Sequence, residues 1–216
     1  MRFENIIFDF DGVIVDSEPV HARAKKRTLD HYSINYDEHI FDRFKGIPDT
    51  DFFKYVSEEL TKGKVTAKEM HDLKKMHYAS LFPEVKLIDG ALAFIQMVRE
   101  TGIHTAIASS TTSRDFHLIN EKYQLGKYFD VMVTGDDTVK HKPHPEPYIK
   151  AIALLQTTPN LCIAIEDSPN GIKSARDSGC TVVGLTSSFN QFELKEAGAD
   201  FIIESFDEFY RVCVNC

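Results

Sequence analysis

The sequence predicts an α/β protein, with a doubly wound, Rossmann-like parallel sheet and an inserted block of helices. Six short apolar runs lack polar alternation, which is typical of parallel strands covered on both faces. Helical patterns separate most of these runs, and such alternation predicts a doubly wound domain. The runs are residues 5–10, 104–109, 131–134, 162–166, 181–185 and 201–203.

Two of the separating helices have clear boundary signals. Residues 90–101 place apolar side chains on one face and stop at Gly102. Residues 168–178 open with Ser168 and Pro169, a capping residue followed by a first-turn proline. These helices would cover the sheet, and ligands of such sheets bind at the carboxyl ends of the strands.

The block between the first two strands contains no convincing strand. Helical patterns cover about 18–32, 50–60 and 66–81, and the last begins with the capping box Thr66-Ala-Lys-Glu69. We therefore expect residues 1–17 and 84–216 to form the α/β core, and residues 18–83 to form a helical cap.

The amino-acid composition and the net charge argue against some classes of function. The chain has 216 residues, 43% of them hydrophobic, and a formal net charge of −8, which argues against a nucleic-acid partner. No apolar stretch is long enough to cross a membrane. The cysteines lack a convincing metal or redox spacing, so we expect free thiols and a cytoplasmic location. Separately, a monomer is the expected oligomeric state.

The first strand is followed by two carboxylates, Asp9 and Asp11, and then by Gly12. Carboxylates are costly at the end of a buried strand unless they are paired or bind a metal. Mg²⁺ takes oxygen ligands and often joins carboxylates to a substrate phosphate. A pair of aspartates that merely caps a turn is the alternative for this motif alone.

Polar side chains also follow the next three strands. Ser109 and Ser110 follow the second, Lys142 lies in the loop after the third, and Glu166 and Asp167 follow the fourth. Taken singly, these could be a helix cap, a solvated charge and a second cap. The carboxyl ends of parallel strands meet at one crevice, however, and the combined set suits phosphoryl transfer.

Residues 9–18 match the pattern D-x-D-G-x-x-x-D-[ST]-E, and the later pieces S-S-T, K-P-x-P and E-D-S occur in matching order. Over essentially its whole length the chain resembles the haloacid dehalogenase superfamily. More narrowly, it resembles the β-phosphoglucomutase-like phosphatases that carry a helical cap. The dehalogenases of this superfamily lack the second aspartate, which this chain has as Asp11, so dehalogenase activity is disfavoured.

The resemblance implies a role for each core residue. Asp9 would be the nucleophile that forms an aspartyl-phosphate, and Asp11 the general acid and base. Ser109, with the amide of Ser110, would bind phosphate oxygens, and Lys142 would neutralise charge between nucleophile and phosphate. Small phosphorylated metabolites are the implied substrates.

The resemblance also implies a Mg²⁺ cofactor. Its ligands would be Asp9, the carbonyl of Asp11 and Asp167, with Glu166 close by.

In the expected cap, the resemblance implies substrate contacts for His21 and Lys45, although a histidine early in a helix is more commonly an interface residue. Related sugar phosphomutases carry an arginine where this chain has Asp49. An acidic residue there would repel a second phosphate, so simple hydrolysis is expected. The alternatives are a sugar phosphomutase and a catalytically retired protein that binds phosphorylated ligands.

Overall fold

The computed structural model describes residues 3–44 and 47–213, and the chain divides into two compact units. Met1–Asp16 and Leu87–Cys216 form one, which we call the core unit. Ser17–Lys86 form the other, which we call the helical unit. None of the described helices is both long and apolar enough to cross a bilayer.

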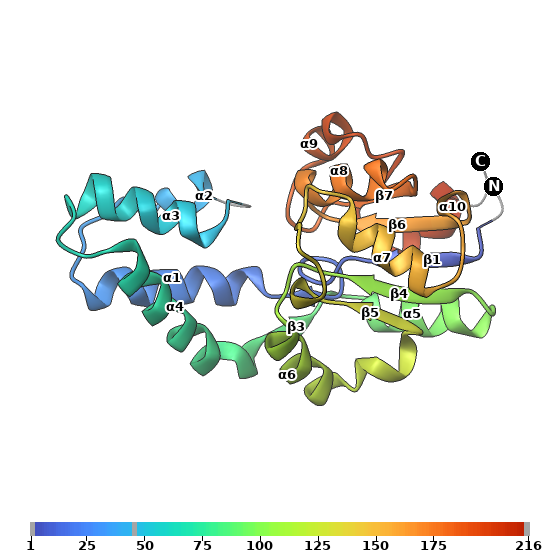
Figure 1. The fold of residues 1–216 in the computed structure, drawn as a ribbon, viewed down its shortest axis with the longest axis horizontal. Helices are drawn as coiled ribbons and strands as arrows, with labels where there is room; N and C mark the ends of the chain where they lie inside the picture. The colour runs from blue at the N-terminus through green and yellow to red at the C-terminus, as the bar shows by residue number, and fades with distance from the viewer. Residues whose placement is uncertain (1–2, 45–46, 214–216) are drawn as a thin grey trace. The chain divides into compact units, whose positions relative to one another are not determined.

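The core unit contains a six-stranded parallel sheet with the order β5-β4-β1-β6-β7-β8 (Figure 1). The chain starts at a central strand, builds one half of the sheet and then returns to build the other. This is the expected doubly wound topology, and its switch point lies between β1 and β6. The strands are β1 (Asn5–Phe8), β4 (His104–Ala108), β5 (Val131–Val133), β6 (Cys162–Glu166), β7 (Thr181–Leu185) and β8 (Phe201–Ile203).

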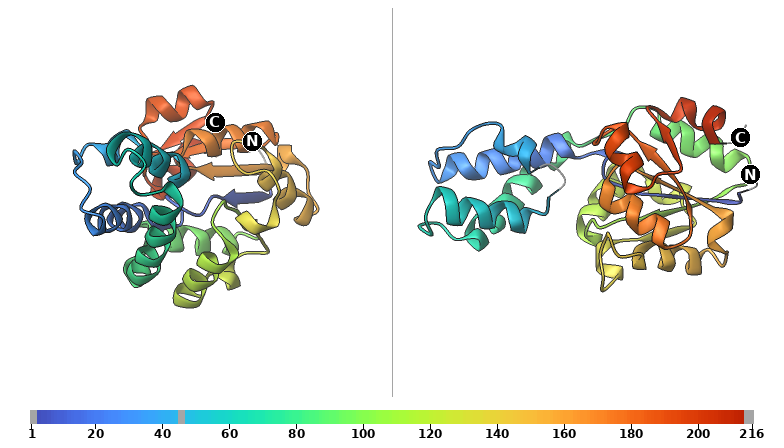
Figure 2. Two further views of the ribbon diagram at one scale, coloured as in Figure 1. Left: turned by 60° about the vertical axis from the view of Figure 1, so that its left-hand side comes forward. Right: turned by 90° about the horizontal axis from the view of Figure 1, so that it is seen from above.

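Helices lie on both sides of this sheet (Figures 1 and 2). Because side chains alternate along a strand, Ile7 packs with the cluster formed by α7, α8 and α9, whereas Phe8 contacts Phe94 of α5 on the other face. The core helices are α5 (Ala91–Glu100), α6 (Ser113–Tyr123), α7 (Glu146–Leu154), α8 (Pro169–Asp177), α9 (Gln191–Ala197) and α10 (Phe209–Cys213).

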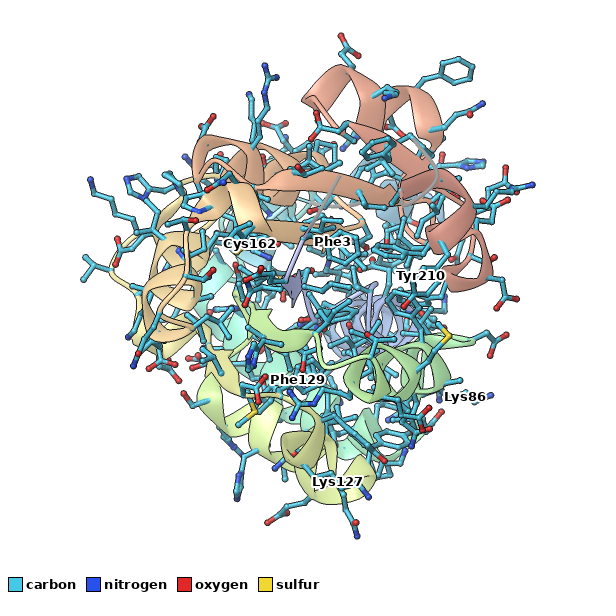
Figure 3. All side chains as sticks on the ribbon, turned by 90° about the vertical axis from the view of Figure 1, so that its right-hand side faces the viewer. Phe3, Lys86, Lys127, Phe129, Cys162 and Tyr210 are labelled. Carbon is cyan, nitrogen blue, oxygen red and sulfur yellow. The ribbon has the colours of Figure 1, made fainter. Side chains whose placement is uncertain are left out.

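Three predicted strands end earlier than expected. β1, β4 and β5 stop at Phe8, Ala108 and Val133, just before the polar residues that follow each apolar run. These polar residues therefore follow the hydrogen-bonded strands and lie at the end of the sheet where the carboxyl ends of the strands meet. Figure 3 views the opposite edge, where Phe3 precedes β1 and Cys162 begins β6. The described cysteines, Cys162, Cys180 and Cys213, are free thiols.

The helical unit contains α1 (Glu18–His31), α2 (Ile40–Arg43), α3 (Asp49–Tyr55) and α4 (Ala67–Leu81). Its apolar cluster centres on Leu29, Phe52, Phe53 and Met70, so the unit has a core of its own. The capping box of Thr66 and Glu69 is confirmed. Two short strands, β2 (Val15–Asp16) and β3 (Lys86–Leu87), pair where the chain passes between the units.

The helix predicted over 50–60 is present, but its type changes in the second half. There α3 gives way to a π-helical turn at Val56–Leu60. The hydroxyl of Thr61 donates to the Ser57 carbonyl at 2.9 Å, and the Gly63 amide donates to the same carbonyl at 2.8 Å. These bonds replace the regular helical pattern at the end of the element.

A buried ionic cluster links three elements of the helical unit. The Asp49 carboxylate lies 3.2 Å from Nζ of Lys25 and 2.6 Å from Nζ of Lys74. Lys74 Nζ also lies 2.7 Å from Nδ1 of His21, whose ring stacks on Tyr78. Burial alone would raise the pKa of Asp49, but the charges of Lys74 and Lys25 outweigh it and lower the pKa to about 2.

Replacing Asp49 should therefore destabilise the helical unit. A pKa lowered to about 2 corresponds to a stabilisation of about 2 kcal/mol at neutral pH, and Asp49→Asn should lose at least that much. Because the folded pKa lies below the unfolded one, the stabilisation is full at neutral pH and falls by about half at pH 3. Denaturant unfolding of both proteins at pH 7 and pH 3 measures this.

Asp51→Asn is the matched control, since Asp51 is exposed in the first turn of the same helix. It should change stability by only about 0.5 kcal/mol. Equal losses for the two variants at pH 7 would contradict a specific role for the Asp49 ion pairs.

Candidate active site

The nucleophile predicted from the sequence, Asp9, lies directly beyond β1 and is 8% exposed. Its amide donates to the carbonyl of Ile165 in β6 at 2.9 Å, so its backbone is anchored at the switch point. The chain then turns through Gly12, which has a φ of 78°. A Cβ atom at Gly12 would overlap the carboxylate of Asp167, so only glycine fits there.

Lys142 connects the carboxylates that follow β1 and β6. Its Nζ lies 2.5 Å from Oδ1 of Asp9 and 2.6 Å from Oε1 of Glu166. Burial alone would lower the pKa of Lys142, but the charges of Asp9 and Glu166 outweigh it and raise the pKa, which keeps the ammonium charged. The three sequence-predicted residues therefore meet in one ion cluster.

Glu166 is completely buried and held on several sides. Besides Lys142, the Tyr148 hydroxyl donates to Oε1 at 2.7 Å, and the Asp167 amide donates to Oε2 at 3.2 Å. A Cβ atom at Gly171, in α8, would overlap this carboxylate. Glu166 is thus fixed in one orientation, and Tyr148, whose ring lies 5.1 Å from the Lys142 ammonium, supports the same arrangement.

Negative charge exceeds positive charge in this cluster. Burial, followed by the charge of Glu166, raises the pKa of Asp9 to about 7, and Lys142 offsets this only in part. Burial and the charges of Asp9 and Glu166 raise the pKa of Asp167 well above its ordinary value. Asp9 and Asp167 therefore resist ionisation, because both are buried and because neighbouring carboxylates add to the effect of burial.

A divalent cation fits this donor set. Asp9, Glu166 and Asp167 each offer a carboxylate oxygen, and the three oxygens lie within 4.8 Å of one another. Hard cations such as Mg²⁺ are bound by oxygen ligands of this kind. A bound cation would also compensate the excess negative charge that raises the pKa values of Asp9 and Asp167.

The loop after β4 brings hydroxyl groups to the same end of the sheet. Ser109 is buried, and its Oγ accepts a hydrogen bond from the Thr111 amide at 2.9 Å. Ser110, which is exposed, follows it. The Thr111 hydroxyl donates to Oδ2 of Asp11, which joins this loop to the one after β1. The Thr112 side chain caps α6.

Two serines after β7 support the opposite side of the carboxylate cluster. Ser187 Oγ donates to the Gly12 carbonyl at 2.5 Å, and Ser188 hydrogen-bonds the Asp167 carboxylate. Both contacts hold the chain near the carboxylates. Neither serine belongs to a motif found in the sequence, so these two contacts were not predicted.

One predicted substrate contact of the inserted block, His21, lies in the helical unit. His21 is paired with Lys74, as described above, and Lys45 lies outside the described residues. The structure corrects one premise of the sequence argument. Asp49 is ion-paired with two lysines, so its charge is already compensated and does not by itself oppose a second phosphate.

Sequence reasoning missed several side chains of the site. Tyr148, Thr111 and Ser188 form hydrogen bonds with the predicted residues Glu166, Asp11 and Asp167, respectively. None of the three was assigned a role from the sequence. Tyr148 could have been suspected, because it lies in the first turn of the helix that follows the K-P-x-P motif. Nothing in the local sequence marks Ser188.

Known proteins resemble this chain along most of its length. A phosphorylated carbohydrates phosphatase of Thermotoga maritima is 33% identical over 206 residues, covering 93% of this chain and 94% of that protein. Fructose-1-phosphate phosphatase YqaB of Escherichia coli is 29% identical, covering 85% of this chain and 97% of that protein.

Solved structures give the same assignment. The crystal structure of a presumptive β-phosphoglucomutase from Thermotoga maritima matches with a TM-score of 0.82 and 30% identity, covering 97% of each chain. The family model for haloacid dehalogenase-like hydrolases matches residues 6–185. The resemblance recognised in the sequence is thereby confirmed, and the chain belongs to the haloacid dehalogenase-like hydrolases.

Proposed function

We propose that this protein is a Mg²⁺-dependent phosphatase that hydrolyses small phosphorylated metabolites through an aspartyl-phosphate intermediate. One observation carries the proposal: Lys142 joins Asp9 to Glu166 beside the buried carboxylate of Asp167. This arrangement provides a nucleophile, a fixed cation and a metal site within one cluster. The phosphatase names of two relatives support the same reaction class.

In the proposed first step, a carboxylate oxygen of Asp9 attacks phosphorus and the bond from phosphorus to the ester oxygen breaks. Asp11 gives its proton to the departing oxygen, which leaves as an alcohol. In the second step, water attacks the phosphorus of the aspartyl-phosphate and loses a proton to Asp11. Inorganic phosphate leaves, and the Asp9 carboxylate is restored.

The remaining residues bind and neutralise the phosphoryl group. Lys142 offsets negative charge between Asp9 and the phosphate, while Ser109 and the Ser110 amide donate to phosphate oxygens. Asp9, Asp167 and the Asp11 carbonyl would hold Mg²⁺, with Glu166 beside them. The cation would supply charge neutralisation at the transferring phosphoryl group.

We further propose that residues 18–83, which lie within the helical unit, act as a cap and select the substrate. Its own apolar core and its ion cluster allow it to stay folded as one body. His21 and Lys45 are its proposed substrate contacts. Sugar phosphates are a favoured class, because both relatives described above are named for phosphorylated carbohydrates.

A sugar phosphomutase is the second candidate. One observation favours it: Asp49 is compensated by Lys25 and Lys74, so the region can accept a second anionic group. The missing arginine at this position favours hydrolysis. A retired binding protein is disfavoured, because binding alone does not need the acid and base Asp11.

Substituting the nucleophile should abolish turnover. Asp9→Asn keeps the size of the side chain but removes the attacking carboxylate, so phosphate release should fall at least about a thousandfold. Phosphate release and mass spectrometry of the trapped intermediate measure this. Asp16→Asn is a control outside the proposed cluster. A folded Asp9→Asn protein that keeps substantial activity would refute the covalent mechanism.

Magnesium should bind more tightly as pH rises. With the Asp9 pKa at about 7 in the metal-free protein, the cation must displace a proton at pH 6 but much less so at pH 8. The Kd for Mg²⁺ should therefore fall by about tenfold or more across this range. Isothermal titration calorimetry measures Kd directly, without relying on activity.

The magnesium titration is repeated with one variant of a proposed ligand and with one control variant. Asp167→Asn should abolish binding, whereas Asp177→Asn, an exposed position at the end of α8, should leave Kd unchanged. A Kd that is independent of pH, or binding that survives Asp167→Asn, would count against the proposed metal site.

A substrate panel tests the function as a whole. Phosphate release should be measured on sugar phosphates, phosphoglycolate and nucleoside monophosphates, with Mg²⁺ and with excess EDTA. We expect Mg²⁺-dependent hydrolysis and no turnover in EDTA. Rapid conversion of β-glucose 1-phosphate to glucose 6-phosphate without phosphate release would support the mutase instead.

A further inference from the structure

We propose that Thr111 is a positioning residue that orients Asp11 for proton transfer. The inference rests on the proposed function, in which Asp11 is the general acid and base. The Thr111 hydroxyl donates to Oδ2 of Asp11, although the two residues lie 100 positions apart. With Oδ2 held in this way, the proton exchanged with the leaving group passes through Oδ1.

The main chain of Thr111 is fixed from two directions. Its amide donates to Oγ of Ser109 at 2.9 Å, and its carbonyl accepts from the Gly135 amide at 2.7 Å. Ser109 is 1% exposed and Gly135 is buried, so both partners are packed into the core unit. The hydroxyl therefore projects from a rigid point on the loop after β4.

The main chain around Asp11 is fixed as well. The amide of Gly12 donates to the Val15 carbonyl at 2.7 Å, and the amide of Ile14 donates to the Phe10 carbonyl at 2.9 Å. β1 and β4 are adjacent parallel strands, with Phe8 opposite Ile107. The two loops thus leave neighbouring strands at the same edge, and the contact between Thr111 and Asp11 joins two rigid segments.

A hydroxyl suits a partner whose protonation changes during the reaction. It can donate to Oδ2 when Asp11 is ionised, and it can still donate to the same oxygen when Oδ1 carries the proton. The carboxyl plane therefore stays in one orientation through both steps. Proton transfer depends steeply on such alignment, because a small displacement of a reacting group can cost orders of magnitude in rate.

This role has a signature that a purely structural role lacks. A departing oxygen of high basicity needs its proton during bond cleavage, whereas a stabilised phenolate needs it much less. Loss of positioning should therefore slow the ester with the more basic leaving group more strongly. Phenyl phosphate and 4-nitrophenyl phosphate form a suitable pair, since they differ in leaving-group basicity and little in shape.

The experiment compares single-turnover phosphorylation of these two esters by the Mg²⁺-loaded parent and by Thr111→Val, which removes the hydroxyl at nearly constant volume. We expect Thr111→Val to slow phenyl phosphate about tenfold more than 4-nitrophenyl phosphate. Thr111→Ser, which keeps the hydroxyl, should restore the ratio of the parent. Thr111→Ala provides a second variant without the hydroxyl, and the melting temperature and the Kd for Mg²⁺ verify the fold.

Equal slowing of both esters by Thr111→Val, or a Thr111→Ser variant that behaves like Thr111→Val, would overturn the positioning role. Asp11→Asn is run in parallel and should show a larger difference between the esters than Thr111→Val. If Asp11→Asn shows no difference, the acid role of Asp11 fails, and the inference fails with it. If the parent forms no phosphoenzyme with either ester or with any member of the substrate panel, the proposed function itself is refuted.

Discussion

The ion pairs of Lys142 with Asp9 and Glu166 are the interaction on which the rest of the site depends. The doubly wound order makes β1 and β6 neighbours at the switch point, so their carboxylates converge whatever the reaction. Burial, followed by the charge of Glu166, raises the pKa of Asp9 to about 7, because one lysine offsets these effects only in part. The topology of the sheet therefore brings together three carboxylates that could hold a cation. Losing Lys142 would leave buried charges unpaired, which is strongly destabilising.

The helical unit also contains buried charges, but there positive charges outnumber the negative charge that pairs with them. Two lysines, Lys25 and Lys74, are buried there, and Asp49 is the anion that makes their burial tolerable. An argument that considers Asp49 alone concludes that the region repels phosphate. The cluster as a whole carries no such excess of negative charge. If this unit selects the substrate, as we propose, its summed charge and shape would decide the selection.

Much of the fold could be predicted because its signals are local. The six strands appear as apolar runs, and polar residues at their ends point to one edge of the sheet. The missing information is tertiary. The partners of Asp49 lie on two other helices, and the hydroxyl that orients Asp11 comes from a loop 100 residues away. Local sequence also could not distinguish the π-helical turn after α3 from a continuous helix.

The loop after β4 combines two tasks in one rigid turn. Ser109 can accept from the Thr111 amide and still donate to a phosphate oxygen, because a hydroxyl does both. The same Thr111 holds Asp11 through its side chain. Thr111 thus joins Ser109, the proposed phosphate donor, to Asp11, the proposed acid. Under the proposed mechanism, a displacement of this turn would therefore disturb phosphate binding and leaving-group protonation together.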